Sequence, residues 1–280
     1  MAYLTDWQFE FPLLVVAVVA ALYAIGWRNR AARRRGAGAE AALFAAGLGA
    51  LVLAFASPLA SLDEELFWAH MAQHVLLLAV APPLILLGRP WSTTWRAFPL
   101  PLRRAAAHGV LRASRSAPLR TAWKTLTAPP MGLAIFCGIL ALWHLPALYD
   151  LTLRSSTTHE LEHSLFLATG LLLWSQLIDS PPLRSRLTYP ARAVYATIAT
   201  AAGWLLAIVL AVAAEPLYTA YVEVASRPGG ISALADQQLA AGIMWVPGSI
   251  PFAAAVLIYV YRWLETEGAG TPATARVVSE

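Results

Sequence analysis

The chain has 280 residues, of which 59% are hydrophobic and only 13% are charged. Soluble domains carry roughly 25% charged residues, so this composition excludes an ordinary water-soluble fold. A single cysteine, Cys137, excludes an intramolecular disulfide framework and a CxxC metal motif. The net charge is +4, but the basic residues lie at the ends of apolar runs, so we expect no nucleic-acid partner.

Seven apolar runs approach the roughly 20 residues that a membrane-spanning helix needs. They cover residues 11–27, 41–57, 66–88, 131–149, 159–179, 191–213 and 236–262. The last contains Pro247 and Pro251, where we expect a kink rather than two spans, since neighbouring helices can satisfy the freed carbonyls. The sequence therefore predicts an all-α, polytopic integral membrane protein with about seven transmembrane helices in one bundle.

The distribution of Lys and Arg predicts the orientation. With the N-terminus outside and the C-terminus inside, eighteen of the twenty basic residues fall on the inner side, and only Arg154 and Arg227 fall outside. Basic residues cluster after the first run, at 28–35, and none precedes it, which is the reverse of a signal peptide and indicates a retained helix.

A single transmembrane domain is predicted over residues 1–265, because the apolar runs recur with one long interruption. This interruption, the inner basic loop 89–130, contains interleaved tryptophans. It either lies on the anionic inner leaflet as an amphipathic segment, with membrane lipid as its partner, or forms a solvated loop. Residues 266–280 are predicted to be a disordered tail.

Five of the six histidines are predicted near the outer ends of helices, together with one carboxylate. These candidate metal ligands are His70, His74, His144, His159, His163 and Asp236. Two pairs have i,i+4 spacing, which places both imidazoles of a pair on one helix face with Cβ atoms about 6 Å apart. A lone interfacial histidine is usually only hydrogen-bonded, but two matched pairs at one depth favour metal ligation.

The carboxylate of Asp236 has three possible roles: ligand, acceptor that fixes an imidazole, or helix N-cap. Met244 shares the face of Asp236 two turns deeper, where core packing is the simpler role. Glu162 lies within the second histidine pair and can attract a cation. With Gln73 and Gln237, these residues are the candidates for supporting the ligands.

Imidazole ligands suit copper, zinc and iron. Because the chain has neither a Cys pair nor a Met cluster, a purely soft copper(I) site is not predicted. We expect copper bound mainly through imidazoles, or zinc, with enough ligands for one ion or two.

Four sequence motifs carry a resemblance to a known family. They are HMAQH running on to APP (70–83), WHLP with the following YD (143–150), HELEH (159–163), and DQQ with MWVPG (236–248). In this order they resemble the CtaG-type cytochrome c oxidase assembly factors of bacteria, over residues 40–262. The resemblance implies a multi-pass protein of the bacterial cytoplasmic membrane that matures a haem-copper oxidase, supplying copper from an upstream donor to the catalytic subunit.

Three functional classes remain open from the residues: a metal-delivery or assembly factor, a membrane metalloenzyme such as a zinc hydrolase, and a haem-binding electron carrier. Haem is disfavoured because i,i+4 histidines on one helix cannot be the two opposite axial ligands. We interpret the chain as a metal-binding assembly factor rather than an enzyme.

Overall fold

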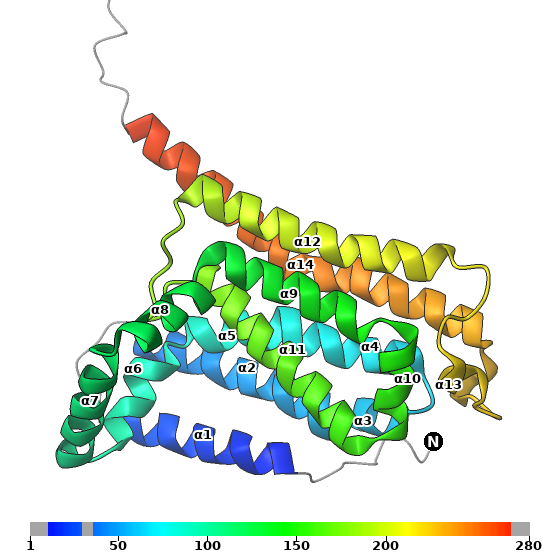
Figure 1. Ribbon diagram of the computed structural model, residues 1–280, viewed down its shortest axis with the longest axis horizontal. Helices are drawn as coiled ribbons and strands as arrows, with labels where there is room; N and C mark the ends of the chain where they lie inside the picture. Colours follow the sequence, from blue (N-terminus) through cyan, green and yellow to red (C-terminus); the bar gives the residue numbers. More distant parts are fainter. Residues whose placement is uncertain (1–10, 30–35, 270–280) are drawn as a thin grey trace, which may run out of the picture.

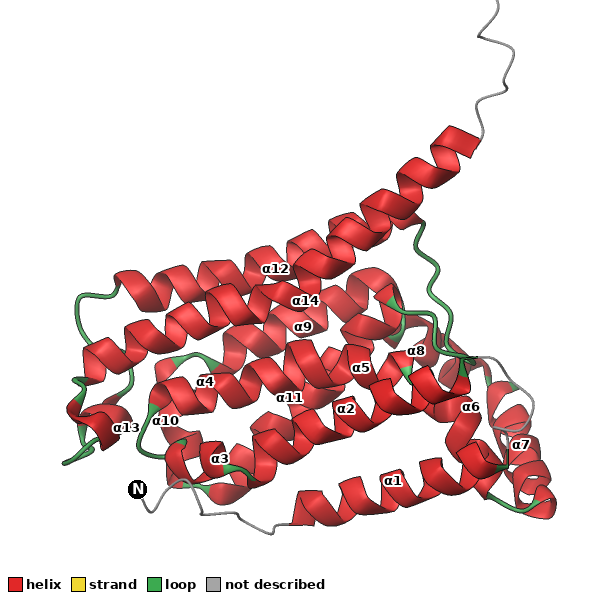
Figure 2. Cartoon of the chain, turned by 180° about the vertical axis from the view of Figure 1, so that it is seen from behind, coloured by secondary structure: helices red, strands yellow, loops and turns green. Residues whose placement is uncertain are grey.

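The computed structural model describes residues 11–29 and 36–269, and all regular secondary structure in these ranges is helical (Figures 1 and 2). The seven predicted apolar runs correspond to α1 (Phe11–Arg28), α2 (Ala37–Ala56), α4 (Phe67–Val75) with η3 (Leu76–Val80) and α5 (Ala81–Leu87), α9 (Pro129–Trp143), α11 (Ser156–Leu177), α12 (Tyr189–Val212) and α14 (Ala233–Ala269). The protein is thus an all-helical, polytopic membrane protein.

Four spans within the described residues are long and apolar enough to cross a membrane by themselves. They are Ala37–Leu62, Phe67–Leu87, Tyr189–Val212 and Ala233–Gly268. The pair α8 (Ala117–Leu126) and α9, bent by 63°, makes a fifth if it is counted as one span, while α1 is shorter. The number seven and the outward N-terminus remain predictions.

Two groups of short helices mark opposite ends of the bundle (Figure 1). At one end lie α6 (Pro90–Thr94), η4 (Trp95–Ala97), α7 (Leu100–Ser114) and α8, all from the basic segment 89–130. At the other end lie α3 (Pro58–Leu62), α10 (Pro146–Arg154), α13 (Thr219–Val222) and η5 (Pro228–Gly230). The basic segment is therefore helical, and its exposed Trp91 and Trp123 favour the amphipathic interpretation over a solvated loop.

Two helix ends differ from the predicted boundaries. The fourth run is predicted to continue to residue 149, but α9 ends at Trp143 because Pro146 disfavours helical geometry at Leu145 and begins α10. The break leaves His144 outside both helices. At the C-terminus, α14 continues to Ala269 as one helix through Pro247 and Pro251, and residues 270–280 of the predicted tail lie outside the described residues.

The central element is the continuous helix α4–η3–α5, which packs against α2, α11 and α14. Pro82 has no N–H to donate to the carbonyl of Leu78 four residues earlier, and the indole of Trp174 donates to that carbonyl instead at 2.9 Å. Gly170 lets α11 approach closely, since a Cβ there would lie 3.0 Å from the carbonyl oxygen of Leu77. Both contacts hold α11 beside α4, and these two helices carry the histidine pairs.

Candidate metal centre

The two histidine pairs face each other between α4 and α11. His70 and His74 occupy successive turns of α4, with their Nε2 atoms 2.8 Å apart. The ring of His163 lies 5.3 Å from both of these rings, and the ring of His159 lies 5.1 Å from that of His70, measured between centroids. The i,i+4 spacing on both helices therefore produces one cluster of four imidazoles.

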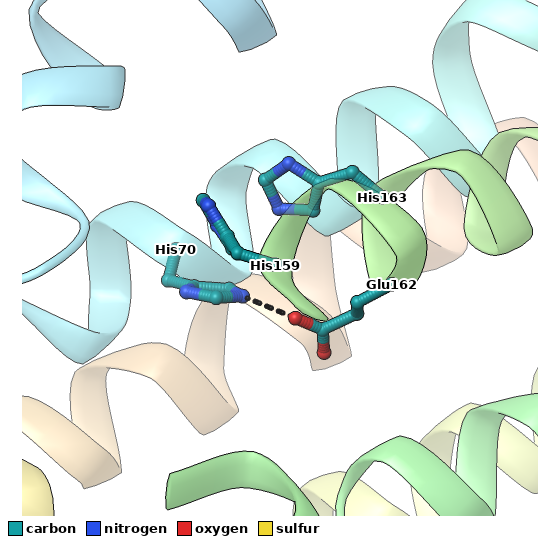
Figure 3. Close-up of side chains that lie close together, drawn as sticks. All are labelled: His70, His159, Glu162 and His163. Atoms are coloured by element: carbon teal, nitrogen blue, oxygen red, sulfur yellow. Dashed lines mark ion pairs between the residues drawn. The ribbon is translucent and has the colours of Figure 1, made fainter. Parts of the chain in front are cut away.

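Glu162 contributes a carboxylate at the centre of this cluster. Its side chain is fully buried, and its oxygens lie 3.3 Å from His70 Nε2 and 3.6 Å from His74 Nε2. Figure 3 shows His70, His159, Glu162 and His163 converging, and their donor atoms all lie within 4.8 Å of one another. Glu162, which the sequence offered as a supporting residue, thus lies among the four residues whose donor atoms converge.

Several polar atoms in the cluster are buried without an ordinary hydrogen bond. Among the described residues, His163 Nε2 and both oxygens of Glu162 have no such partner. Buried polar groups are normally satisfied, so these unsatisfied atoms call for a ligand. Neutral imidazoles and a carboxylate are the donor set that a divalent transition metal takes.

One pair of imidazoles in this cluster needs only a small rearrangement to share a metal ion. Two imidazole nitrogens that bind one ion at 2.0–2.1 Å in tetrahedral geometry lie about 3.3 Å apart. The Nε2 atoms of His70 and His74 are 2.8 Å apart and need to separate slightly. The donor set therefore fits a metal ion.

His144 lies beside this cluster in the break between α9 and α10. Its ring is 5.8 Å from the ring of His74. Its Nδ1 donates to the carbonyl of Leu140 at 2.8 Å, and its Nε2 faces the Sδ atom of Met71 at 3.4 Å. The sequence prediction missed Met71, and the available signal was its position inside the HMAQH motif, one residue after His70 and three before His74.

Aromatic side chains cover the cluster at the α13 end. Phe67, Tyr149, Tyr218 and Tyr221 are buried and pack on one another. Tyr221 donates to the carbonyl of Asp63 at 2.6 Å, and Tyr218 to that of His144 at 3.2 Å. Burial raises the pKa of the Tyr218 and Tyr221 hydroxyls, which therefore stay protonated and keep these hydrogen bonds. The cluster is closed on this side.

A cavity of about 630 Å³ reaches the cluster from another side. His159, His163 and Gln73 line it, together with the acidic residues Asp63, Glu64 and Glu160. Glu64 and Glu160 are exposed, so the cavity extends to the protein surface. Asp63 lies deeper, with Oδ2 3.5 Å from His159 Nε2. Three acidic residues thus outnumber the one basic residue of the lining, Arg154, which favours a cation over an anion near His159.

Asp236 lies apart from the cluster and has another role. Its two oxygens accept hydrogen bonds from the backbone N–H groups of Phe67 and Trp68, at 2.8 and 3.0 Å. It thus caps the first turn of α4 from α14, a different helix from the one at whose start it lies, and its predicted role as a ligand stays a prediction.

The remaining candidates also have mainly structural contacts. Gln237 accepts from Leu217 N and donates to Leu210 O, which ties α14 to the end of α12. Gln73 donates to Ala54 O, while its buried oxygen faces no hydrogen-bond donor among the described residues. Met244 packs in the core and lines a small cavity beside His74.

The structure predicts that Asp236→Ala destabilises the protein without removing a ligand. Loss of a capping carboxylate costs about 1–2 kcal/mol, so thermal unfolding of the purified protein should begin at a lower temperature. The metal content of the folded protein, measured by elemental analysis, should stay that of the wild type. Asp236→Asn keeps one acceptor oxygen and should lose less stability, whereas a loss of metal equal to that of a histidine variant would restore Asp236 as a ligand.

These features define a helical membrane protein with a buried cluster of imidazoles and a carboxylate near one end of its bundle. The chain belongs to the family of cytochrome c oxidase caa3 assembly factors, whose sequence pattern matches residues 21–266. The resemblance carried by the four motifs is thereby confirmed.

Curated relatives come from mycobacteria. Uncharacterised proteins of Mycobacterium bovis and Mycobacterium tuberculosis are each 27% identical over 274 residues, and one of Mycobacterium leprae is 24% identical over 267 residues. Each match covers 93% of this chain but only 40% of the relative, so the chain spans less than half the length of these proteins. No solved structure matches the chain.

Proposed function

We propose that this protein assists the assembly of a haem-copper cytochrome c oxidase by binding copper at the histidine cluster and passing it to the catalytic subunit. The observation that carries the proposal is the convergence of two histidine pairs and Glu162 in one buried site, in a member of an oxidase assembly family. We place the protein in the bacterial cytoplasmic membrane, with the cluster in the outer half. Zinc is the alternative ion, and the cluster has donors for one ion or two.

The donor set suits a protein that releases its ion. Imidazoles and a carboxylate hold copper without thiolates, and the acidic cavity gives an upstream copper donor access to His159. An imidazole must be deprotonated to bind a metal, so the affinity should fall in acid, where protons compete for the imidazole nitrogens.

A second candidate function is a membrane metalloenzyme. The observation in its favour is the cavity of about 630 Å³ beside His159 and His163, which has room for a small substrate. Zinc held there would lower the pKa of a bound water to about 7 and make a hydrolase. Such an enzyme would retain its metal through turnover, and a cell lacking it would accumulate substrate.

The deciding experiment measures copper in the oxidase itself. In a strain lacking this protein, we expect oxidase activity and the copper content of the purified oxidase to fall, while haem content and transcript levels stay near normal. Wild-type protein should restore the copper, and the double variant His74→Ala/His163→Ala should not. Normal oxidase copper in the deletion strain would contradict delivery and favour the enzyme.

A further inference from the structure

The contact between His144 and Met71 joins two atoms that both carry lone pairs. A carbonyl oxygen only accepts hydrogen bonds, so the 2.8 Å contact with Leu140 O places a proton on His144 Nδ1. The neutral ring then has a bare lone pair on Nε2. This nitrogen faces Met71 Sδ at 3.4 Å, and a thioether has no hydrogen to donate.

Met71 is fully buried, and His144 is 6% exposed beside a cavity of about 50 Å³. A second proton on His144 would place a positive charge in an apolar environment, which is costly. The lone pairs of His144 Nε2 and Met71 Sδ therefore face each other with no hydrogen atom between them. A soft cation is the group that both can bind at once.

The spacing of the two donor atoms fits one shared ion. With metal–nitrogen and metal–sulfur bonds of about 2.0 and 2.3 Å, donors 3.4 Å apart subtend an angle of about 105° at the metal. This angle is close to the tetrahedral value. Thioether ligands select copper(I), whereas the imidazole and carboxylate donors around Glu162 also suit zinc or copper(II).

We propose that His144 Nε2 and Met71 Sδ form a second metal position, specific for copper(I), beside the position formed by His70, His159, Glu162 and His163. It rests on the proposal that the cluster binds metal. His74 lies between the two positions, with its ring 5.3 Å from that of His163 and 5.8 Å from that of His144, and can serve either one.

The two positions also meet different cavities. The first opens to the acidic cavity at His159 and His163. The second adjoins a cavity of about 50 Å³ between α4, α9, α12 and α14, lined by His74, His144 and Met244. An ion that enters beside the acidic residues can thus pass His74 to reach the second position, where the thioether of Met71 is a softer ligand.

The test loads the purified full-length protein, free of a histidine tag, with copper(I) under anaerobic conditions or with zinc(II). X-ray absorption of the copper form should show a sulfur scatterer at about 2.3 Å. Met71→Leu, which conserves volume, should remove this scatterer and weaken copper(I) binding by about tenfold or more, leaving zinc stoichiometry unchanged. The matched control is Met131→Leu in the first turn of α9, which should keep both the sulfur scatterer and the copper(I) affinity.

Two results would overturn the second position: copper(I) with only nitrogen and oxygen neighbours in the wild type, or a sulfur scatterer that persists in Met71→Leu. If zinc binding is normal, either result would still leave the proposed position at His70, His159, Glu162 and His163 standing. A wild-type protein that binds neither ion would overturn the proposed function together with this inference.

Discussion

Replacing His163 with alanine is expected to abolish stable metal binding. Its Nε2 is buried, has no hydrogen-bond partner among the described residues and lies with three other donor atoms within 4.8 Å. Changes in groups that only support a ligand cost 10–100-fold in metal affinity, so loss of a ligand should cost about 100-fold or more. Competition with a chelator of known affinity measures this loss.

The matched control is His108→Ala. His108 is exposed on α7, at the opposite end of the bundle from the cluster, and its removal should leave both affinity and stoichiometry unchanged. Full metal content in His163→Ala would mean that this pair is only an interfacial hydrogen-bonding feature. The double variant His74→Ala/His163→Ala removes one donor from each facing helix and should bind no metal at dialysis equilibrium.

Glu162→Gln is expected to have an effect of similar size through charge alone. Glutamine keeps the shape and one acceptor oxygen but cannot supply the negative charge that the carboxylate carries when it holds a cation. At an effective dielectric constant of 20, unit charges 4 Å apart interact by about 4 kcal/mol, so binding of a cation should weaken by about 100- to 1,000-fold. Isothermal titration with zinc and with copper gives this ratio directly.

The same substitution separates binding from stability. A buried carboxylate is costly to desolvate, so the metal-free Glu162→Gln protein should be as stable as the wild type or more stable. Glu160→Gln, two residues away and exposed, is the matched control and should bind metal almost normally. Equal losses in both variants would indicate long-range attraction by the acidic cavity rather than ligation by Glu162.

Much of the fold was predictable because the membrane constrains the sequence locally. Each apolar run must satisfy its own backbone hydrogen bonds, so length and hydropathy located all seven principal helical segments. The break at His144 was missed because residues 131–149 are apolar apart from His144 itself, although Pro146 was a local signal for it. The helices of the basic segment carry weaker apolar patterns, and both a loop and an amphipathic segment fitted the sequence.

For the candidate ligands, too, the sequence predicted one part of the arrangement and helix packing decided the other. The i,i+4 spacing of His70/His74 and of His159/His163 is a property of one helix, so each pair could be read from the sequence. That α4 and α11 face each other depends on their close packing at Gly170 and on the bond from Trp174 to Leu78 O. The sequence indicated that the histidines share a depth, but not which helices are neighbours.

Contacts between distant segments decided the roles of the remaining residues. Glu162 is central because the helix phase of α11 turns it toward His70, and Asp236 is a cap because α14 brings it to the first turn of α4, 169 residues away from Phe67. Met71 meets His144 across 73 residues of chain. The sequence by itself determined the helical membrane fold and the histidine pairs, since these follow from periodicity and hydropathy. Only the tertiary structure selected the carboxylate and the sulfur beside them, because that choice depends on packing between helices.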